Sequence, residues 1–155
     1  MDEHAHSEPE SLKEQIGRII EEARMMLPGI QALFGFQTIA VFSDRFERLP
    51  VYAQDCHAAA LALVVVAIAL VMLPAAYHRL AEPSIVSRRA IKVSSRAICY
   101  ALAPLAAALA LDVAVVLYMV TESSMASAGG GLCAFVLLIG LWFAYPLRQR
   151  RKSLH

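Results

Sequence analysis

Four long apolar stretches restrict what this chain can fold into more than any other feature of its sequence. They cover residues 25–43, 57–77, 97–120 and 127–147, and each approaches or exceeds the roughly 20 residues with which a helix crosses a bilayer. A helix satisfies its own backbone hydrogen bonds, which lipid cannot do. Since 59% of the residues are apolar and 17% are charged, a soluble domain of this length lacks an interior large enough to bury that surface. We therefore predict an all-α fold, an integral membrane four-helix bundle over residues 25–147.

The basic residues are distributed unevenly between the ends of these stretches. Only Arg45 and Arg48 lie in the first hairpin loop, and the loop 121–126 has no basic residue. The other twelve of the 14 basic residues precede the first stretch, separate the second from the third, or follow the fourth: Lys13, Arg18, Arg24, Arg79, Arg88, Arg89, Lys92, Arg96, Arg148, Arg150, Arg151 and Lys152. Because cytoplasmic loops carry the excess of Lys and Arg, we predict cytoplasmic termini, with residues 148–155 forming a basic cytoplasmic tail.

An amphipathic N-terminal helix over residues 11–27 is expected ahead of the first span. Ser11 and Glu14 form an S-x-x-E capping box, and Pro28-Gly29 predicts a break or kink at the far end. An apolar seam with steps of three and four residues follows one face: Leu12, Ile16, Ile19, Ala23 and Met26. Such a helix either lies on the inner leaflet, at the membrane interface, or associates with a second copy. Residues 1–10 are acidic and are expected to be a disordered arm.

Asp112 is the one acidic or basic residue deep inside any of the four stretches. An ionised aspartate near mid-bilayer costs about 2.5–3.5 kcal/mol on insertion scales, and a carboxyl that exchanges a proton there is the simplest proton or cation site. The alternative is a protonated side chain that only bonds a neighbouring helix. At 1.5 Å of rise per residue, Gln37 and Thr38 are expected at the depth of Asp112, about 5 Å outward of the bilayer centre. Gln31 extends this polar line toward the cytoplasm.

A second polar group lies between the first and second stretches. Asp44, Arg45 and Glu47 crowd the outer end of the first stretch, and His57 begins the second. One interpretation is a solvated loop whose exposed ion pairs contribute at most about 1 kcal/mol. The other is an outer vestibule in which His57 senses pH near its ordinary titration range.

The sequence contains no pattern that is typical of an enzyme, a cofactor site or a metal site. Walker loops, dinucleotide fingerprints, nucleophile elbows and HExxH motifs do not occur. Cys56, Cys99 and Cys133 match no zinc or redox spacing. A net charge of +1 leaves no basic excess for binding nucleic acid. We therefore expect no catalytic residues, cofactor or nucleic-acid partner.

The run LPGIQALFGFQTIAVFSDRFERLP, followed after the second stretch by LPAAYHRLAE, resembles a family of small bacterial four-helix membrane proteins of unknown function. Members are sometimes labelled sodium:proton antiporter. The resemblance covers roughly residues 18–147. It implies a location in the bacterial inner membrane, and it transfers no established site residues to this chain.

Taken together, these patterns favour a homo-oligomeric carrier or channel for protons or small monovalent cations, with Asp112 as its titrating group. Small residues at four-residue steps permit either a compact bundle or a homo-oligomeric seam: Ala106, Ala110, Ala114, Gly140 and Ala144. The competing hypothesis is a non-transporting interaction or regulatory protein, in which the N-terminal amphipathic helix docks a partner or lipid and the bundle is its anchor.

Overall fold

The computed structural model describes residues 11–81 and 87–152. These residues form helices α1 (Leu12–Ala40), α2 (Asp44–Glu47), α3 (Val51–Ala81), α4 (Arg88–Thr121) and α5 (Ser124–Ile139), a π-helical turn η1 (Gly140–Ala144) and helix α6 (Tyr145–Lys152). The described part of the chain contains no strand, which confirms the all-α prediction. The predicted disordered arm 1–10 and residues 153–155 of the predicted tail lie outside the described residues.

Three helices are long and apolar enough to cross a membrane in the part of the chain that the structure describes. They are α3, α4 and the continuous helix Ser124–Arg150, which contain the predicted stretches 57–77, 97–120 and 127–147. These helices extend beyond the predicted stretches because their polar ends stay helical. The first predicted span, 25–43, is the least apolar of the four, since Gln31, Gln37 and Thr38 interrupt it.

Helix α1 is one helix, where the sequence predicted an interfacial helix over 11–27 and a separate span over 25–43. Pro28 lies inside it without ending it, although an internal proline costs about 3 kcal/mol. The apolar seam continues beyond the proline with the same period, and its buried positions are Ile16, Ile19, Ala23, Ile30 and Gln37. Packing on both sides of Pro28 therefore offsets the lost hydrogen bond.

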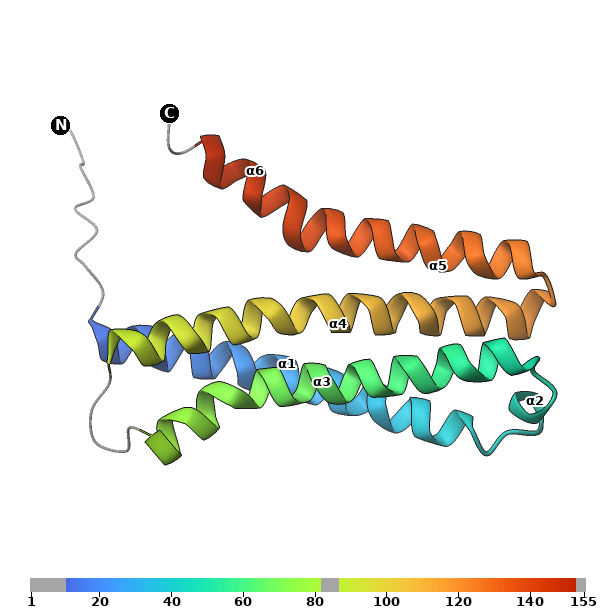
Figure 1. The fold of residues 1–155 in the computed structure, drawn as a ribbon, viewed down its shortest axis with the longest axis horizontal. Helices are drawn as coiled ribbons and strands as arrows, with labels where there is room; N and C mark the ends of the chain where they lie inside the picture. The colour runs from blue at the N-terminus through green and yellow to red at the C-terminus, as the bar shows by residue number, and fades with distance from the viewer. Residues whose placement is uncertain (1–10, 82–86, 153–155) are drawn as a thin grey trace.

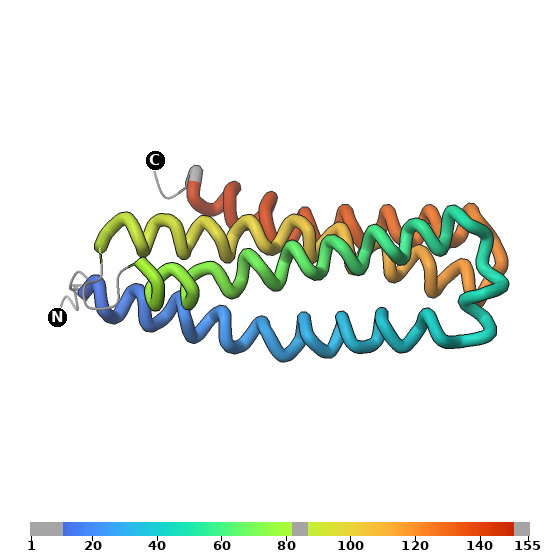
Figure 2. The backbone as a smooth tube through the Cα atoms, turned by 60° about the horizontal axis from the view of Figure 1, so that its bottom comes forward, coloured from blue at the N-terminus to red at the C-terminus, as the bar shows by residue number. Residues whose placement is uncertain are grey.

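The seam of α1 packs inside its own chain. Ile19, Ala23 and Ile30 belong to the main apolar core, together with buried residues of α3 and α4. Figure 2 shows α1 running alongside these two helices. The apolar face that was expected to lie on the inner leaflet or to bind a second copy is thus already covered.

The predicted capping box at the start of α1 is confirmed. The Ser11 hydroxyl accepts a hydrogen bond from the Glu14 amide, at 3.3 Å, and a Glu14 carboxylate oxygen accepts one from the Ser11 amide, at 2.8 Å. Hydrogen bonds from the Ser11 side chain and backbone lower the pKa of Glu14. These bonds satisfy backbone donors that a helix leaves open in its first turn.

Helices α3 and α4 pack closely along small side chains. The buried positions of α3 alternate in steps of four and three: Ala53, His57, Ala60, Val64, Ala67, Val71 and Pro74. Facing them, α4 buries alanines at positions 90, 97, 101 and 108. Small residues let helix backbones approach each other. His57 occupies one position of this seam.

Helix α5 packs mainly on α4. A Cβ added to Gly131 would lie 2.9 Å from the Ala114 Cβ and 3.0 Å from the Ala110 carbonyl oxygen. Ser127 donates a hydrogen bond to the Ala114 carbonyl at 2.7 Å. Part of the small-residue pattern on α4 therefore serves a contact within the chain.

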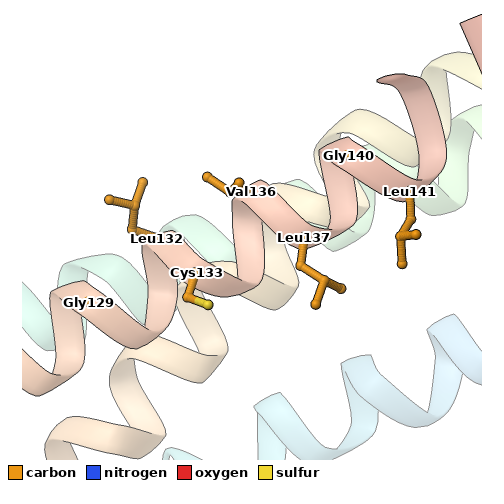
Figure 3. Close-up of a pocket in the computed structure, with 7 residues that line it drawn as sticks. All are labelled: Gly129, Leu132, Cys133, Val136, Leu137, Gly140 and Leu141. Carbon is orange, nitrogen blue, oxygen red and sulfur yellow. The ribbon is translucent and has the colours of Figure 1, made fainter. Parts of the chain in front are cut away.

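Trp142 still packs against the core, and beyond it the last helix leaves the bundle (Figure 1). Pro146 has no amide hydrogen and its ring disturbs the preceding turn, and just before it the Tyr145 amide donates to the Gly140 carbonyl, five residues back. The predicted basic tail continues from this π-helical turn as α6. An open apolar groove of ≈ 640 Å³ lies along this helix. Among the residues that line it, Leu132 and Val136 point to one side of the helix, and Cys133, Leu137 and Leu141 point to the other (Figure 3).

Gly131 and Gly129, which lie within one turn of α5 and have different surroundings, give a matched test of the α4–α5 contact. We expect Gly131→Ala to destabilise the protein by about 1–3 kcal/mol, because the added methyl group overpacks the contact with Ala114 and Ala110. Gly129→Ala adds the same methyl group where nothing lies within 4 Å, so its stability should stay equal or rise. Thermal unfolding in detergent, followed by circular dichroism, measures both. Equal loss in the two variants would contradict this packing.

Candidate functional site

Asp112 and Gln37 meet inside the helical core. The Gln37 side-chain amide donates a hydrogen bond of 2.7 Å to the Asp112 carboxylate and so joins α1 to α4. Gln37 is 3% exposed, and the Asp112 side chain is 16% exposed. The contact agrees with the equal depths that the sequence predicts for these two residues, since α1 and α4 run in the same direction and both residues lie beyond the centres of their helices.

His57 is the third member of the site. Its ring is buried, and its Nε2 lies 2.9 Å from the main-chain carbonyl oxygen of Gln37. A carbonyl oxygen only accepts hydrogen bonds, so Nε2 carries a proton and donates. The other ring nitrogen, Nδ1, then faces the Asp112 carboxylate at 3.9 Å.

This arrangement suits one exchangeable proton. In a neutral ring that is protonated at Nε2, Nδ1 presents a lone pair, and a deprotonated Asp112 would present another lone pair opposite it. A proton on either atom turns this repulsion into attraction. At 3.9 Å the two atoms are too far apart for a direct hydrogen bond, so transfer requires the side chains to approach each other or a bridging water.

Gln37 contributes to the site twice, through its backbone carbonyl and its side-chain amide. Its remaining polar atom, Oε1, is buried without a hydrogen-bond partner. Buried acceptors are rarely left without a partner. An unpaired acceptor beside a carboxyl group can receive a proton-bearing group or a small cation. The site therefore has one unused acceptor in its present arrangement.

An apolar layer covers the site on the side of α2. The Phe46 ring contacts His57 edge-on, with 5.0 Å between the ring centroids. Next to it Leu49, Ala53 and Val115 form a small buried cluster. The Ser43 hydroxyl caps α2 by accepting from the Phe46 amide. This layer covers His57 on the side of α2.

Two of the predicted site residues lie away from the site. Thr38 is exposed, and its hydroxyl donates to the Phe34 carbonyl at 2.9 Å. Gln31 is also exposed. Each residue turns a helix by about 100°, so Thr38 lies about 100° around α1 from Gln37 at nearly equal depth. Depth alone therefore cannot select partners.

The residues of the predicted outer vestibule differ in exposure and do not form one site. Asp44, Arg45 and Glu47 are exposed on α2, whereas His57 is buried beside Asp112. The predicted stretch begins at residue 57, whereas the helix begins at Val51, directly after Pro50. Proline is typical of helix starts, and a start near residue 51 would have placed His57 almost two turns inside.

The site offers few ligands for a metal ion. Within residues 11–81 and 87–152, no three His, Cys, Asp or Glu side chains lie close enough together to bind one jointly. What the site does offer is one carboxylate, one imidazole and one amide. This set suits a proton or a single small cation.

A glutamine pair on α1 tests the contact that forms the site. Gln37→Leu removes the donor to Asp112 and leaves a buried carboxylate oxygen without its partner, so we expect a loss of about 1–3 kcal/mol. Gln31→Leu makes the same chemical change at an exposed position of the same helix and should be nearly neutral. Thermal unfolding of both variants in one detergent gives the comparison. Equal stabilities would mean that the hydrogen bond contributes nothing.

Comparison with known proteins gives one match. The model of a family described as a family of unknown function, DUF6328, matches residues 5–146. No curated protein and no solved structure matches the chain.

Proposed function

The chain belongs to this family of unknown function, DUF6328, and from that premise we propose a homo-oligomeric membrane carrier or channel for protons or small cations. The observation that carries the proposal is the hydrogen-bonded Asp112, which faces the buried His57 between helices that are apolar enough to cross a membrane. Intramembrane carboxyls are costly and commonly mark proton or ion pathways. Asp112 binds the ion, His57 exchanges a proton with it, and Gln37 positions both.

The proposed topology has four spans, with α1 as the first, in a bacterial inner membrane. Both termini and the loop between α3 and α4 are cytoplasmic. The basic ends of α1, α3, α4 and α6 gather at one end of the molecule (Figure 1), which supports this orientation through the excess of Lys and Arg in cytoplasmic loops. The turn after α4 and the short helix α2 then lie on the periplasmic side.

A path from the periplasm to Asp112 follows from this topology. An ion arrives among the exposed charges of Asp44, Arg45 and Glu47, passes the layer of Phe46 and Leu49, and reaches His57. The path continues from His57 to Asp112. Its closed apolar layer favours a carrier or a gated channel over an open pore.

Oligomerisation is part of the proposal because one copy offers few polar side chains for a pathway. Since the seam of α1 is covered within the chain, the bare face of α5 is the better candidate for a contact between copies. This face carries Leu132 and Val136, each more than half exposed. Native mass spectrometry in mild detergent measures the number of copies.

Two exposed residues at opposite ends of the molecule test the topology. Met125, in the first turn of α5, is 87% exposed, and Leu80, near the end of α3, is 84% exposed. In a variant without the three native cysteines, we expect a membrane-impermeant maleimide added to whole cells to label Met125→Cys and not Leu80→Cys. The reverse pattern would overturn the orientation and the path derived from it.

Asp112→Asn tests the function. Asparagine keeps the size and hydrogen-bonding capacity of the side chain and removes its charge and proton. We expect proton-coupled flux in proteoliposomes to fall to the level of empty vesicles, while the protein still inserts. Asp55→Asn, the same change at an exposed position of α3, should keep wild-type flux, and Gln37→Leu should reduce flux less than Asp112→Asn does. Full flux in the Asp112→Asn variant would rule out this residue as the titrating group.

The alternative, a non-transporting interaction protein, predicts another order of effects. Asp112→Asn would then be silent, and Asp112→Leu would damage folding through the lost bond to Gln37. The alternative also requires the N-terminal half of α1 to bind through its polar face, because its apolar face is covered. Absence of any flux from wild-type proteoliposomes, with the protein shown to be inserted, would favour it.

A further inference from the structure

A hollow lies beside α2, at the end of the molecule opposite to most basic residues. It has a volume of ≈ 590 Å³. Arg45, Arg48 and Leu49 line it from α2 and the segment that follows, and Tyr118, Met119 and Glu122 line it from the end of α4. We call it the α2 hollow. It opens where α3 and α4, two helices able to cross a membrane, reach their ends, so it lies at the level of lipid head groups.

The α2 hollow contains two basic residues at the end of the molecule where Lys and Arg are otherwise absent. Arg45 and Arg48 are the two basic residues that the distribution of Lys and Arg leaves at this end, and both line the same hollow. In the described part of the chain, neither guanidinium forms an ion pair, although Glu122 lines the hollow as well. Two arginines without acidic partners at one concave surface indicate an anionic ligand.

We infer that the α2 hollow binds a phosphate group, either free or in the head group of an anionic phospholipid. A guanidinium presents a planar fork of donors that matches phosphate oxygens. The lining carries two positive charges and one negative charge, which suits the single negative charge of a phosphodiester. Leu49 and Met119 add an apolar wall that fits the glycerol and the first carbons of a lipid.

Glu122 provides a second test of this site, because its negative charge weakens binding of an anionic ligand. It caps α4 in the left-handed conformation, with φ 53°, at the wall of the hollow. Its carboxylate repels a phosphate group, and Glu122→Gln removes this repulsion without shortening the side chain. A true anion site should therefore bind more tightly in this variant.

Lipid and phosphate binding to the full chain in mild detergent tests the inference. Native mass spectrometry measures retention of phosphatidylglycerol, with zwitterionic phosphatidylcholine as the reference lipid. We expect Arg45→Gln/Arg48→Gln to weaken phosphatidylglycerol binding at least tenfold and Glu122→Gln to strengthen it several-fold. Arg88→Gln/Arg89→Gln removes the same charge from two exposed residues at the other end and should change binding less than twofold.

Competition by inorganic phosphate distinguishes the two sources. Displacement of phosphatidylglycerol by millimolar phosphate would identify free phosphate as a ligand, and failure of displacement would identify the lipid head group. Equal effects of the two double variants, equal retention of both lipids, or no binding of either probe would overturn the inference. Thermal unfolding of each variant, with the single changes Arg45→Gln and Arg48→Gln, checks that lost binding is not lost folding.

Discussion

Alanine side chains set the distance between α3 and α4, and this distance determines which polar groups meet in the core. The alanines of both helices face each other along the seam, so the two backbones approach closely. A histidine in such a seam has little room and must find a partner nearby. His57 finds the carbonyl of Gln37 on one side and Asp112 on the other. Helix α1 then packs against both helices and completes the site.

The polar cluster contributes more to the choice of one arrangement than to stability. Hydrogen bonds between helices in a membrane contribute only about 0.6–1.7 kcal/mol each, whereas an internal proline such as Pro28 costs about 3 kcal/mol. Apolar packing on both sides of Pro28 must therefore supply most of what holds α1 in place. The bond between Gln37 and Asp112 instead fixes the rotation of α1 about its own axis.

The sequence allowed the helices, the capping box and the contact between Gln37 and Asp112 to be predicted, because periodicity and depth are local properties of each helix. The partner of the α1 seam could not be predicted, since an apolar stripe fits lipid, a second copy or its own bundle equally well. His57 was misplaced because hydropathy marks where a helix becomes apolar, whereas the helix itself begins at Val51. Thr38 was grouped with Gln37 because depth carries no information on direction around the helix.

One residue makes both bonds that tie α1 to the site, and this has a mechanical consequence. A turn of α1 by one residue step, about 100°, breaks the bond to His57 and the bond to Asp112 together. The charge state of the carboxyl and the angular position of the helix are therefore thermodynamically linked, and linkage acts in both directions. Ser11 caps the same helix about 39 Å away along its axis, so a rotation of α1 that starts at this end also changes the two bonds that Gln37 makes. Helix α1 thus connects the three side chains of the site with the opposite end of the bundle.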